Sequence, residues 1–435
     1  MVIIEPVWKI LYITIIIKRG QGPCQVPAGD FPGEPQPRIA VHLRVNRYAL
    51  RLTISKRNLS THTVFFHAIM TVMIYAVSER RTLYMLSFLI IGSGYRSEYY
   101  GRIAMKYPEL FRAMFLCRSE AKAAMITAHT GVCATTDHAE ALSFSPDFVV
   151  VAVDKEHVAD VTEEWVLRGF PVVAETPVGS SVEKLRRIWR LQEERDAKIV
   201  CCEQYHRNPL LAAGFADLAD GLMGRPLNGY LSFAHDYHAA SLIRRMLMTG
   251  SEEYVLRGER RTGHVSETDS RTCAYYDGHT TAEVRDLIHI TFASGKTAVY
   301  DFAPPQYRSF IRSRHLTVRC ERGEWSDRIE YYLDEENIPR KKMLEPLIPK
   351  RYRLLDTQAL RDIRRTWAPE LQPDTQEDEY AIATMLLDMK DYIAGGETPY
   401  PLWEALEDAL FSILLEEAVK KPWQEIVPPR MPWHI

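Results

Sequence analysis

The chain has 435 residues, of which 46% are hydrophobic and 26% charged, with a formal net charge of -3. This balance allows two globular domains and an appendage, and it lacks the strongly basic character of a nucleic-acid-binding domain. Seven cysteines without a CxxC pair argue against a disulfide framework and favour a reducing, cytoplasmic setting, in which Cys201 and Cys202 are expected to be small buried residues.

The first 84 residues differ from the rest in charge, with 11 Lys/Arg against 4 Asp/Glu. Their apolar runs, residues 1–17 and 63–77, are too interrupted or too short for a membrane span, which needs about 20 apolar residues. The first run also lacks the basic start of a signal peptide. We predict that residues 1–84 are not part of the folded unit, and that they are either an upstream extension from a misplaced start or a genuine tail, poorly ordered or membrane-associating.

A strand, a glycine-rich turn and a helix are predicted from residue 86 onward. The apolar run 86–91 is typical of a buried parallel strand, and residues 98–107 have helical character. Between them, Gly92 permits a tight turn, Gly94 lets backbone approach a pyrophosphate, and Ser97 takes the place of the third glycine of a GxGxxG motif. The turn therefore predicts a dinucleotide site at the helix N-terminus, with Tyr95 and Arg96 among its contacts.

Strands and helices then alternate. Strands are predicted at residues 111–117, 148–153, 171–174 and 197–201, and helices at 120–130, 137–142, 160–168 and 182–195. This alternation indicates a doubly wound parallel sheet, a Rossmann domain over residues 85–203. The second strand ends in Arg118 and Ser119 without a carboxylate for a ribose 2′-hydroxyl, which favours NADP over NAD. Alternatively, Arg118 stacks on adenine or faces solvent while NAD is bound.

Residues 204–421 are predicted to form an α+β domain with an open, largely antiparallel sheet, followed by a tail at 422–435. Helices are expected at residues 210–222, 239–248, 378–393 and 402–419, and strands at 227–233, 284–292, 297–302 and 310–319, continuing at 323–324. Residues 294–296 form a hairpin turn between two of these strands.

His235, Asp236 and His238 form a dense polar cluster between a predicted strand and a predicted helix. A histidine near its free pKa suits proton transfer to or from a substrate hydroxyl, and a neighbouring carboxylate can fix its tautomer. A divalent metal or a purely structural hydrogen-bonded loop are the alternatives, and no metal is assigned. Arg271 could reach a polyol or a carboxylate, and a surface ion pair explains it equally well.

Two further segments carry a family resemblance. Residues 169–177, ending in Glu175-Thr176-Pro177, resemble the Glu-Lys-Pro segment of the glucose-fructose oxidoreductase / inositol dehydrogenase / rhizopine catabolism (Gfo/Idh/MocA) family. Residues 203–209 are similar to its Glu-Asn-x-x-x-Asn-Pro motif, and 151–157 to its loop beside the nicotinamide. The resemblance covers residues 86–421. It implies contacts with cofactor from Val153, Asp154, His157, Glu175 and Pro177, contacts with substrate from Tyr205, His206 and Asn208, and a homodimer or tetramer through the open sheet.

The resemblance also implies an NAD(P)-dependent oxidoreductase of a sugar, cyclitol or related polyol, with His238 or His235 moving the hydroxyl proton. Thr176 stands where the family has its catalytic Lys, and Ala234 stands where the family has an Asp partner for the histidine. Two alternatives therefore stay open. One is glycoside cleavage through transient oxidation by NAD, and the other is a non-catalytic nucleotide-binding or structural protein.

Overall fold

The computed structural model describes the strands that lie within residues 2–54, and residues 85–270, 273–355 and 375–434. The chain divides into two compact units, Met1–Tyr84 and Met85–Ile435. In the first unit, β1 (Val2–Ile4) pairs antiparallel with β2 (Leu11–Ile13), and β4 (Ile39–Val45) pairs with β3 (Ile16–Lys18) and β5 (Tyr48–Ile54). These strands were not predicted. The exclusion of residues 1–84 from the folded unit stays a prediction.

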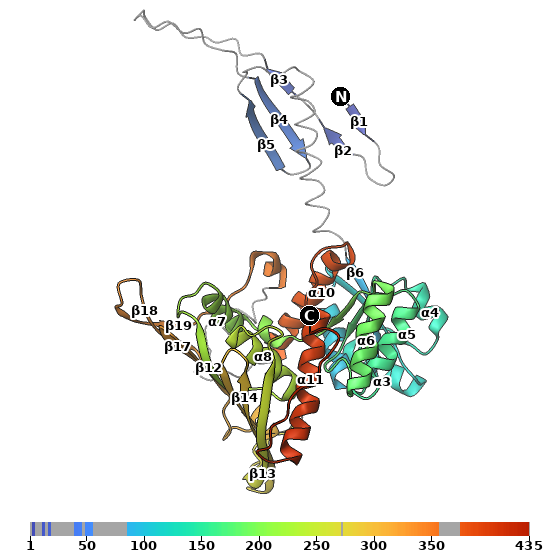
Figure 1. The fold of residues 1–435 in the computed structure, drawn as a ribbon. Coiled ribbons are helices and arrows are strands. Elements are labelled where there is room, and N and C mark those ends of the chain that lie inside the picture. The colour runs from blue at the N-terminus through green and yellow to red at the C-terminus, as the bar shows by residue number, and fades with distance from the viewer. Residues whose placement is uncertain are drawn as a thin grey trace, which may run out of the picture. The chain divides into compact units, whose positions relative to one another are not determined.

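The second unit, drawn in cyan to red in Figure 1, begins with a parallel sheet. This sheet has six strands in the order β11-β10-β9-β6-β7-β8, and every pairing is parallel. Its strands are β6 (Leu86–Ile91), β7 (Phe111–Leu116), β8 (Ala134–Thr135), β9 (Phe148–Val151), β10 (Val172–Ala174) and β11 (Ile199–Cys201). Its helices are α2 (Tyr95–Lys106), α3 (Glu120–Thr130), α4 (His138–Ser143), α5 (Val158–Leu167) and α6 (Val182–Arg195). The β9 side chains are fully buried, as strands covered on both faces require, and the doubly wound α/β prediction is confirmed.

The second sheet has eight strands in the order β13-β14-β15-β12-β16-β17-β18-β19, and only the β12–β15 pair is parallel. Its strands are β12 (Pro226–Ser232), β13 (Tyr254–Ser266), β14 (Thr280–Phe292), β15 (Thr297–Phe302), β16 (His315–Cys320), β17 (Gly323–Ser326), β18 (Ile329–Leu333) and β19 (Pro339–Met343). The largely antiparallel sheet is therefore confirmed. The predicted hairpin joins β14 to β15, with Gly295 at φ +85°.

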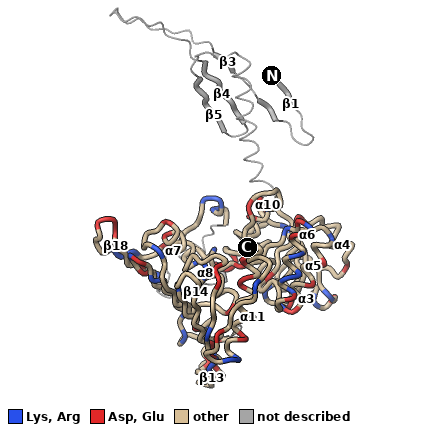
Figure 2. Tube along the Cα trace, viewed as in Figure 1, with Lys and Arg blue, Asp and Glu red and all other residues tan. Residues whose placement is uncertain are grey.

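Helices α8 (Asp236–Leu247) and α11 (Leu402–Lys420) cover one face of this sheet, where they contact β12 and β13. Other strand positions carry ion pairs, such as Arg285 with Asp301 at 2.5 Å and Arg319 with Glu324 at 2.9 Å. Charges of both signs are interspersed along the trace (Figure 2). The homodimer or tetramer through the sheet stays a prediction.

Several predicted element boundaries differ from the structure, and two of these differences bear on the site. Helix α8 begins at Asp236 rather than at residue 239, so His238 lies in its first turn and not before it. Strand β16 begins at His315 rather than at residue 310, because the Gln306 side chain donates to the carbonyl of Ser313 (2.9 Å) and the hydroxyl of Ser232 (2.9 Å) and so holds the preceding residues as a loop. Gln306 itself lies in the short helix η2 (Pro304–Tyr307).

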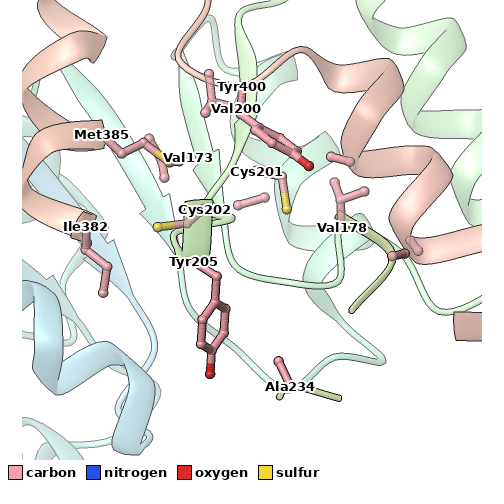
Figure 3. Close-up of a cluster of buried hydrophobic side chains, with 14 of the residues drawn as sticks. Val173, Val178, Val200, Cys201, Cys202, Tyr205, Ala234, Ile382, Met385 and Tyr400 are labelled. Carbon is pink, nitrogen blue, oxygen red and sulfur yellow. The ribbon is translucent and has the colours of Figure 1, made fainter. Parts of the chain in front are cut away.

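The two parts of this unit meet in one apolar cluster (Figure 3). Val173 and Cys201 come from the parallel sheet, Cys202 follows directly, and Ile382 and Met385 come from α10 (Thr375–Ile393). Both cysteines are buried, as predicted. The cluster also includes Tyr205 of η1 (Tyr205–Arg207), the short helix that leads into α7 (Pro209–Ala219). The carboxyl edge of the parallel sheet therefore faces the second domain. Among the described residues, no helix has the length and apolarity needed to cross a membrane.

Candidate active site

The glycine turn between β6 and α2 has the geometry of a phosphate site. Gly92 has φ +130°, and a Cβ there would lie 2.2 Å from the carbonyl oxygen of Ala152, so only glycine fits. Gly94 is the N-cap of α2, receives no side-chain cap, and has no atom within 4 Å of an added Cβ. The buried Ser97 donates its hydroxyl proton to the Gly94 carbonyl at 2.6 Å. This leaves open space beside the helix N-terminus, which fits a pyrophosphate.

The end of β7 presents a free cation. Arg118 is exposed, and no hydrogen bond or ion pair joins it to another residue that the structure describes. Ser119 is the N-cap of α3, where its hydroxyl accepts from the Lys122 amide at 3.4 Å. The guanidinium of Arg118 is thus available to a ligand at the place where an adenosine ribose meets this fold.

The loops after β9 and β10 lie on the same edge of the sheet. Val153 is half-buried, Asp154 accepts from the Glu156 amide at 3.0 Å and so closes a turn, and His157 is the exposed N-cap of α5. Pro177 is buried and follows a cis peptide bond. The hydroxyl of Thr176 shares a hydrogen bond with Tyr237 of α8, so this loop touches the second domain.

Glu175, which is buried, and Arg96, which is partly buried, form an ion pair next to Thr176 in the chain. Glu175 is 5% exposed and accepts from the Arg96 Nε at 2.8 Å and from the Tyr100 hydroxyl at 2.5 Å. Arg96 also lies 3.9 Å from Asp378 of α10, and its Nη2 is buried without a hydrogen-bond partner. A guanidinium therefore stands next to the position where the resembling family has its lysine. The sequence placed Arg96 in the cofactor loop but gave no sign of this pairing.

Glu203 and His238 form the central pair of the site. The His238 Nδ1 lies 2.5 Å from the Glu203 Oε2, and the residues are 6% and 1% exposed. The other Glu203 oxygen accepts from the Tyr205 amide at 3.1 Å, which fixes the carboxyl group at the end of β11. The carboxylate partner that is missing at Ala234 is supplied by Glu203, 35 residues earlier in the chain. Sequence reasoning placed Glu203 in a motif and missed this role.

Burial sets the charge state of the pair. It raises the pKa of Glu203 to about 8, while burial and the Arg96 charge lower the pKa of His238 to about 3. Both directions favour the neutral forms, because a charge is poorly solvated in this interior. The pair therefore carries no net charge at neutral pH, with a proton held between Nδ1 and Oε2.

The other two members of the predicted polar cluster have different partners. The backbone N–H of His235 donates to the Tyr307 hydroxyl at 2.9 Å, and its ring Nδ1 contacts the same hydroxyl. Asp236 instead lies 3.4 Å from the Ser412 hydroxyl of α11, and burial raises its pKa to about 6. Asp236 therefore does not pair with His238, and the expectation that it fixes the tautomer gives way to Glu203.

The predicted substrate residues are spread around η1. The Tyr205 ring lies edge-on to His238, with ring centroids 4.6 Å apart, whereas His206 packs against Tyr400 at 5.4 Å. Asn208 is buried, caps α7 by accepting from the Leu210 amide at 3.0 Å, and donates to Glu377 at 2.9 Å. Its polar atoms are used inside the protein. Arg271 lies outside the described residues.

Comparison with known proteins agrees with this geometry. Residues 86–202 match the sequence model of an oxidoreductase family with an NAD-binding Rossmann fold, GFO_IDH_MocA. This confirms the resemblance drawn from the sequence. No curated protein gives a significant sequence match.

Solved structures with the same fold cover most of the chain. Levoglucosan dehydrogenase in complex with NADH and levoglucosan is 14% identical, with a TM-score of 0.59 over 80% of this chain and 100% of its own. An Agrobacterium radiobacter oxidoreductase in complex with NAD+, L-tartaric acid and magnesium is 14% identical, with a TM-score of 0.58 over 79% of this chain and 98% of its own. A putative myo-inositol dehydrogenase from Sinorhizobium meliloti 1021 is 14% identical, with a TM-score of 0.54 over 79% of this chain and 100% of its own. At this identity the likeness shows the fold.

Proposed function

We propose that this chain, whose Rossmann domain belongs to the Gfo/Idh/MocA oxidoreductase family, is an NAD(P)-dependent oxidoreductase of a sugar, cyclitol or related polyol. The observation that carries the proposal is the buried Glu203–His238 pair, at 2.5 Å, on the sheet edge that also bears the glycine turn. Structural relatives whose names include levoglucosan and myo-inositol dehydrogenase support the substrate class.

His238 is the proposed acid/base. Its Nδ1 faces Glu203, so Nε2 is the nitrogen left to exchange a proton with a substrate hydroxyl. Glu203 holds the ring and takes up the second proton, which keeps the histidine from becoming an unpaired buried cation. When bound, the nicotinamide would supply the hydride chemistry, and the protein aligns the substrate carbon with it.

Arg96 is the proposed replacement for the family lysine at Thr176. It is a permanent cation, lies between Glu175 and Asp378, and influences the pKa of His238. A cation there stabilises negative charge on the substrate oxygen as its proton leaves. Lys155, whose charge lowers the pKa of His235, is a further nearby cation, but it is exposed and its charge is screened by water.

The surroundings complete the proposal. Tyr205, His235 and His206 would line the substrate side, with Arg271 as a further predicted contact. The free guanidinium of Arg118 supports a preference for NADP over NAD. The six cysteines that the structure describes are free thiols, which supports a cytoplasmic setting, and the open sheet face is proposed to form the homodimer or tetramer.

The test is a calorimetric titration of the full chain with NADH and NADPH, followed by oxidation assays on a panel of sugars and cyclitols. Micromolar cofactor binding with net formation of reduced cofactor is the expected result, with tighter binding of NADPH that is lost in Arg118→Ala. Failure of the folded protein to bind either cofactor would disprove the proposal. Binding without any net reduced cofactor would favour glycoside cleavage if a glycoside is split, and a non-catalytic role if none is.

A further inference from the structure

Arg314 is a buried cation, 7% exposed, that forms no ion pair within the described part of the chain. Its Nη1 is buried without a hydrogen-bond partner, and Nε makes one long hydrogen bond, 3.4 Å, to the Gln306 carbonyl. A charge removed from water is costly unless it is paired, so this arrangement favours an anionic partner that the described residues do not supply within ion-pair distance.

Aromatic rings hold the guanidinium in place. Its carbon lies 4.7 Å from the centre of the Tyr307 ring and 5.3 Å from that of Phe233. Such contacts are attractive, but they leave the N–H groups unsatisfied. The loop before β16, which Gln306 ties to Ser232 and Ser313, fixes the backbone that carries Arg314.

The same rings form one wall of the proposed active site. Phe233 packs against Tyr205 with centroids 5.8 Å apart, and Tyr205 packs against His238 at 4.6 Å. Tyr307 contacts His235 and shares a hydrogen bond with Tyr205. The Arg314 charge also contributes to lowering the pKa of His238. Two aromatic rings in succession, Phe233 and Tyr205, therefore link Arg314 to His238.

The charges around the site are unevenly matched. Arg96 is paired with Glu175 and lies near Asp378, so its charge is balanced within the protein. Arg314 acts electrostatically on the same Asp378 but forms no ion pair with any residue that the structure describes. One guanidinium with unused donors in a planar fork suits one planar carboxylate, whereas a phosphate monoester with nearly two negative charges would need a second free cation.

We infer that Arg314 binds the carboxylate of the substrate, so that the enzyme acts on an acidic sugar or polyol of the uronate or aldonate type. The inference rests on the proposed function. The carboxylate would anchor on Arg314 while a hydroxyl elsewhere on the carbon chain meets His238. The orphaned nitrogen of Arg314 is then satisfied only when an acidic substrate is bound, which selects against the neutral analogue.

Matched substrate pairs test the inference on the full chain with bound cofactor: D-glucose with D-glucuronate, D-galactose with D-galacturonate, and D-glucitol with D-gluconate. We expect the acid of a pair to have kcat/KM roughly 100-fold above that of its neutral analogue. Arg314→Met should remove that advantage with little change for the neutral analogue, and Arg314→Lys should keep part of it. Arg308→Met, at an exposed position six residues away, is the matched control and should behave like the wild type.

The outcomes separate the two proposals. No cofactor binding would overturn the oxidoreductase proposal itself. Cofactor binding with the neutral member preferred, or an equal loss for both members in Arg314→Met, would overturn only the carboxylate inference. If neither member of any pair is turned over, calorimetry measures the binding of the acids and of their neutral analogues to the cofactor-bound protein. Failure of every acid to bind would then overturn the carboxylate inference. A lower melting temperature of Arg314→Met without substrate would assign Arg314 a structural role instead.

Discussion

The glycine turn after β6 and the Glu203–His238 pair are built in opposite ways. The turn occupies six consecutive residues, Gly92 to Ser97, and its geometry follows from their order along the chain. The pair joins the end of β11 to the first turn of α8, and its neighbours Arg96 and Arg314 come from still other elements. Cofactor binding is thus encoded locally, whereas proton transfer depends on how two domains pack. The predictions below test that difference.

The largest effect is expected at the turn itself. Gly92→Ala would place a methyl group at a φ of +130° and against the Ala152 carbonyl, which should cost roughly 2–6 kcal/mol of unfolding free energy. Gly94→Ala meets no atom within 4 Å, so it should fold normally and lose cofactor affinity by about tenfold or more. Thermal melts and cofactor titrations measure both.

Gly263→Ala is the control, since its added Cβ also meets no atom within 4 Å and the residue lies on β13, away from the turn. It should change neither stability nor cofactor binding. Normal stability of Gly92→Ala would contradict the local account of the turn.

Substitutions in the Glu203–His238 pair are expected to lower the catalytic rate and to leave cofactor affinity unchanged. His238→Gln and Glu203→Gln should each lower kcat by roughly 10²–10⁴-fold, because the acid/base or its proton partner is removed. The double variant should be little worse than either single one, since the two residues act as a unit. Glu324→Gln, in an exposed ion pair on β17, is the control. Full activity in either single variant would refute the pair's role.

Arg96 links the two regions, because it lies in the local turn and serves the packed site. Arg96→Leu should lower kcat by roughly 100-fold through loss of the cation beside the substrate oxygen. Adding Thr176→Lys to that variant should restore part of the rate, since a cation returns to the same place. Arg102→Leu, which breaks an ion pair nearly two turns along α2, is the control. If Thr176→Lys restores none of the rate lost in Arg96→Leu, Arg96 is not the replacement cation.

The smallest effect is the pH dependence. In the oxidation direction the pair must accept a proton, and Glu203 is protonated below its pKa of about 8, so kcat/KM should rise with pH and level off above about 8. Glu203→Gln should abolish this ionisation. Because the folded pKa is raised from 4.5, the contribution of Glu203 to stability is fully present below about 4.5 and is lost as pH rises through 8. Measurements of kcat/KM and of the melting temperature against pH, on the wild type and on Glu203→Gln, test both expectations.

Sequence reasoning succeeded wherever the signal was local. The spacing of Gly92, Gly94 and Ser97 between an apolar run and a helix predicted the turn, and helices α3 and α6 have the predicted bounds. It missed β13, β18 and β19, whose charged and polar residues do not alternate cleanly with apolar ones. The start of α8 was misplaced because His235 caps the helix without a side-chain hydrogen bond, and such a cap leaves no sequence signal.

The sequence alone determined the parallel sheet, the glycine turn and the resemblance of the first domain to an oxidoreductase family, because hydrophobic periodicity and glycine conformation act over a few residues. Only the tertiary structure decided which carboxylate meets His238, which cation stands beside Thr176 and which buried guanidinium lacks a partner. The Glu203–His238 hydrogen bond joins residues 35 positions apart, and the Arg96–Glu175 hydrogen bond joins residues 79 positions apart. Sheet order and the packing of α8 and α10 bring them together, and no pattern along the chain specifies that distance.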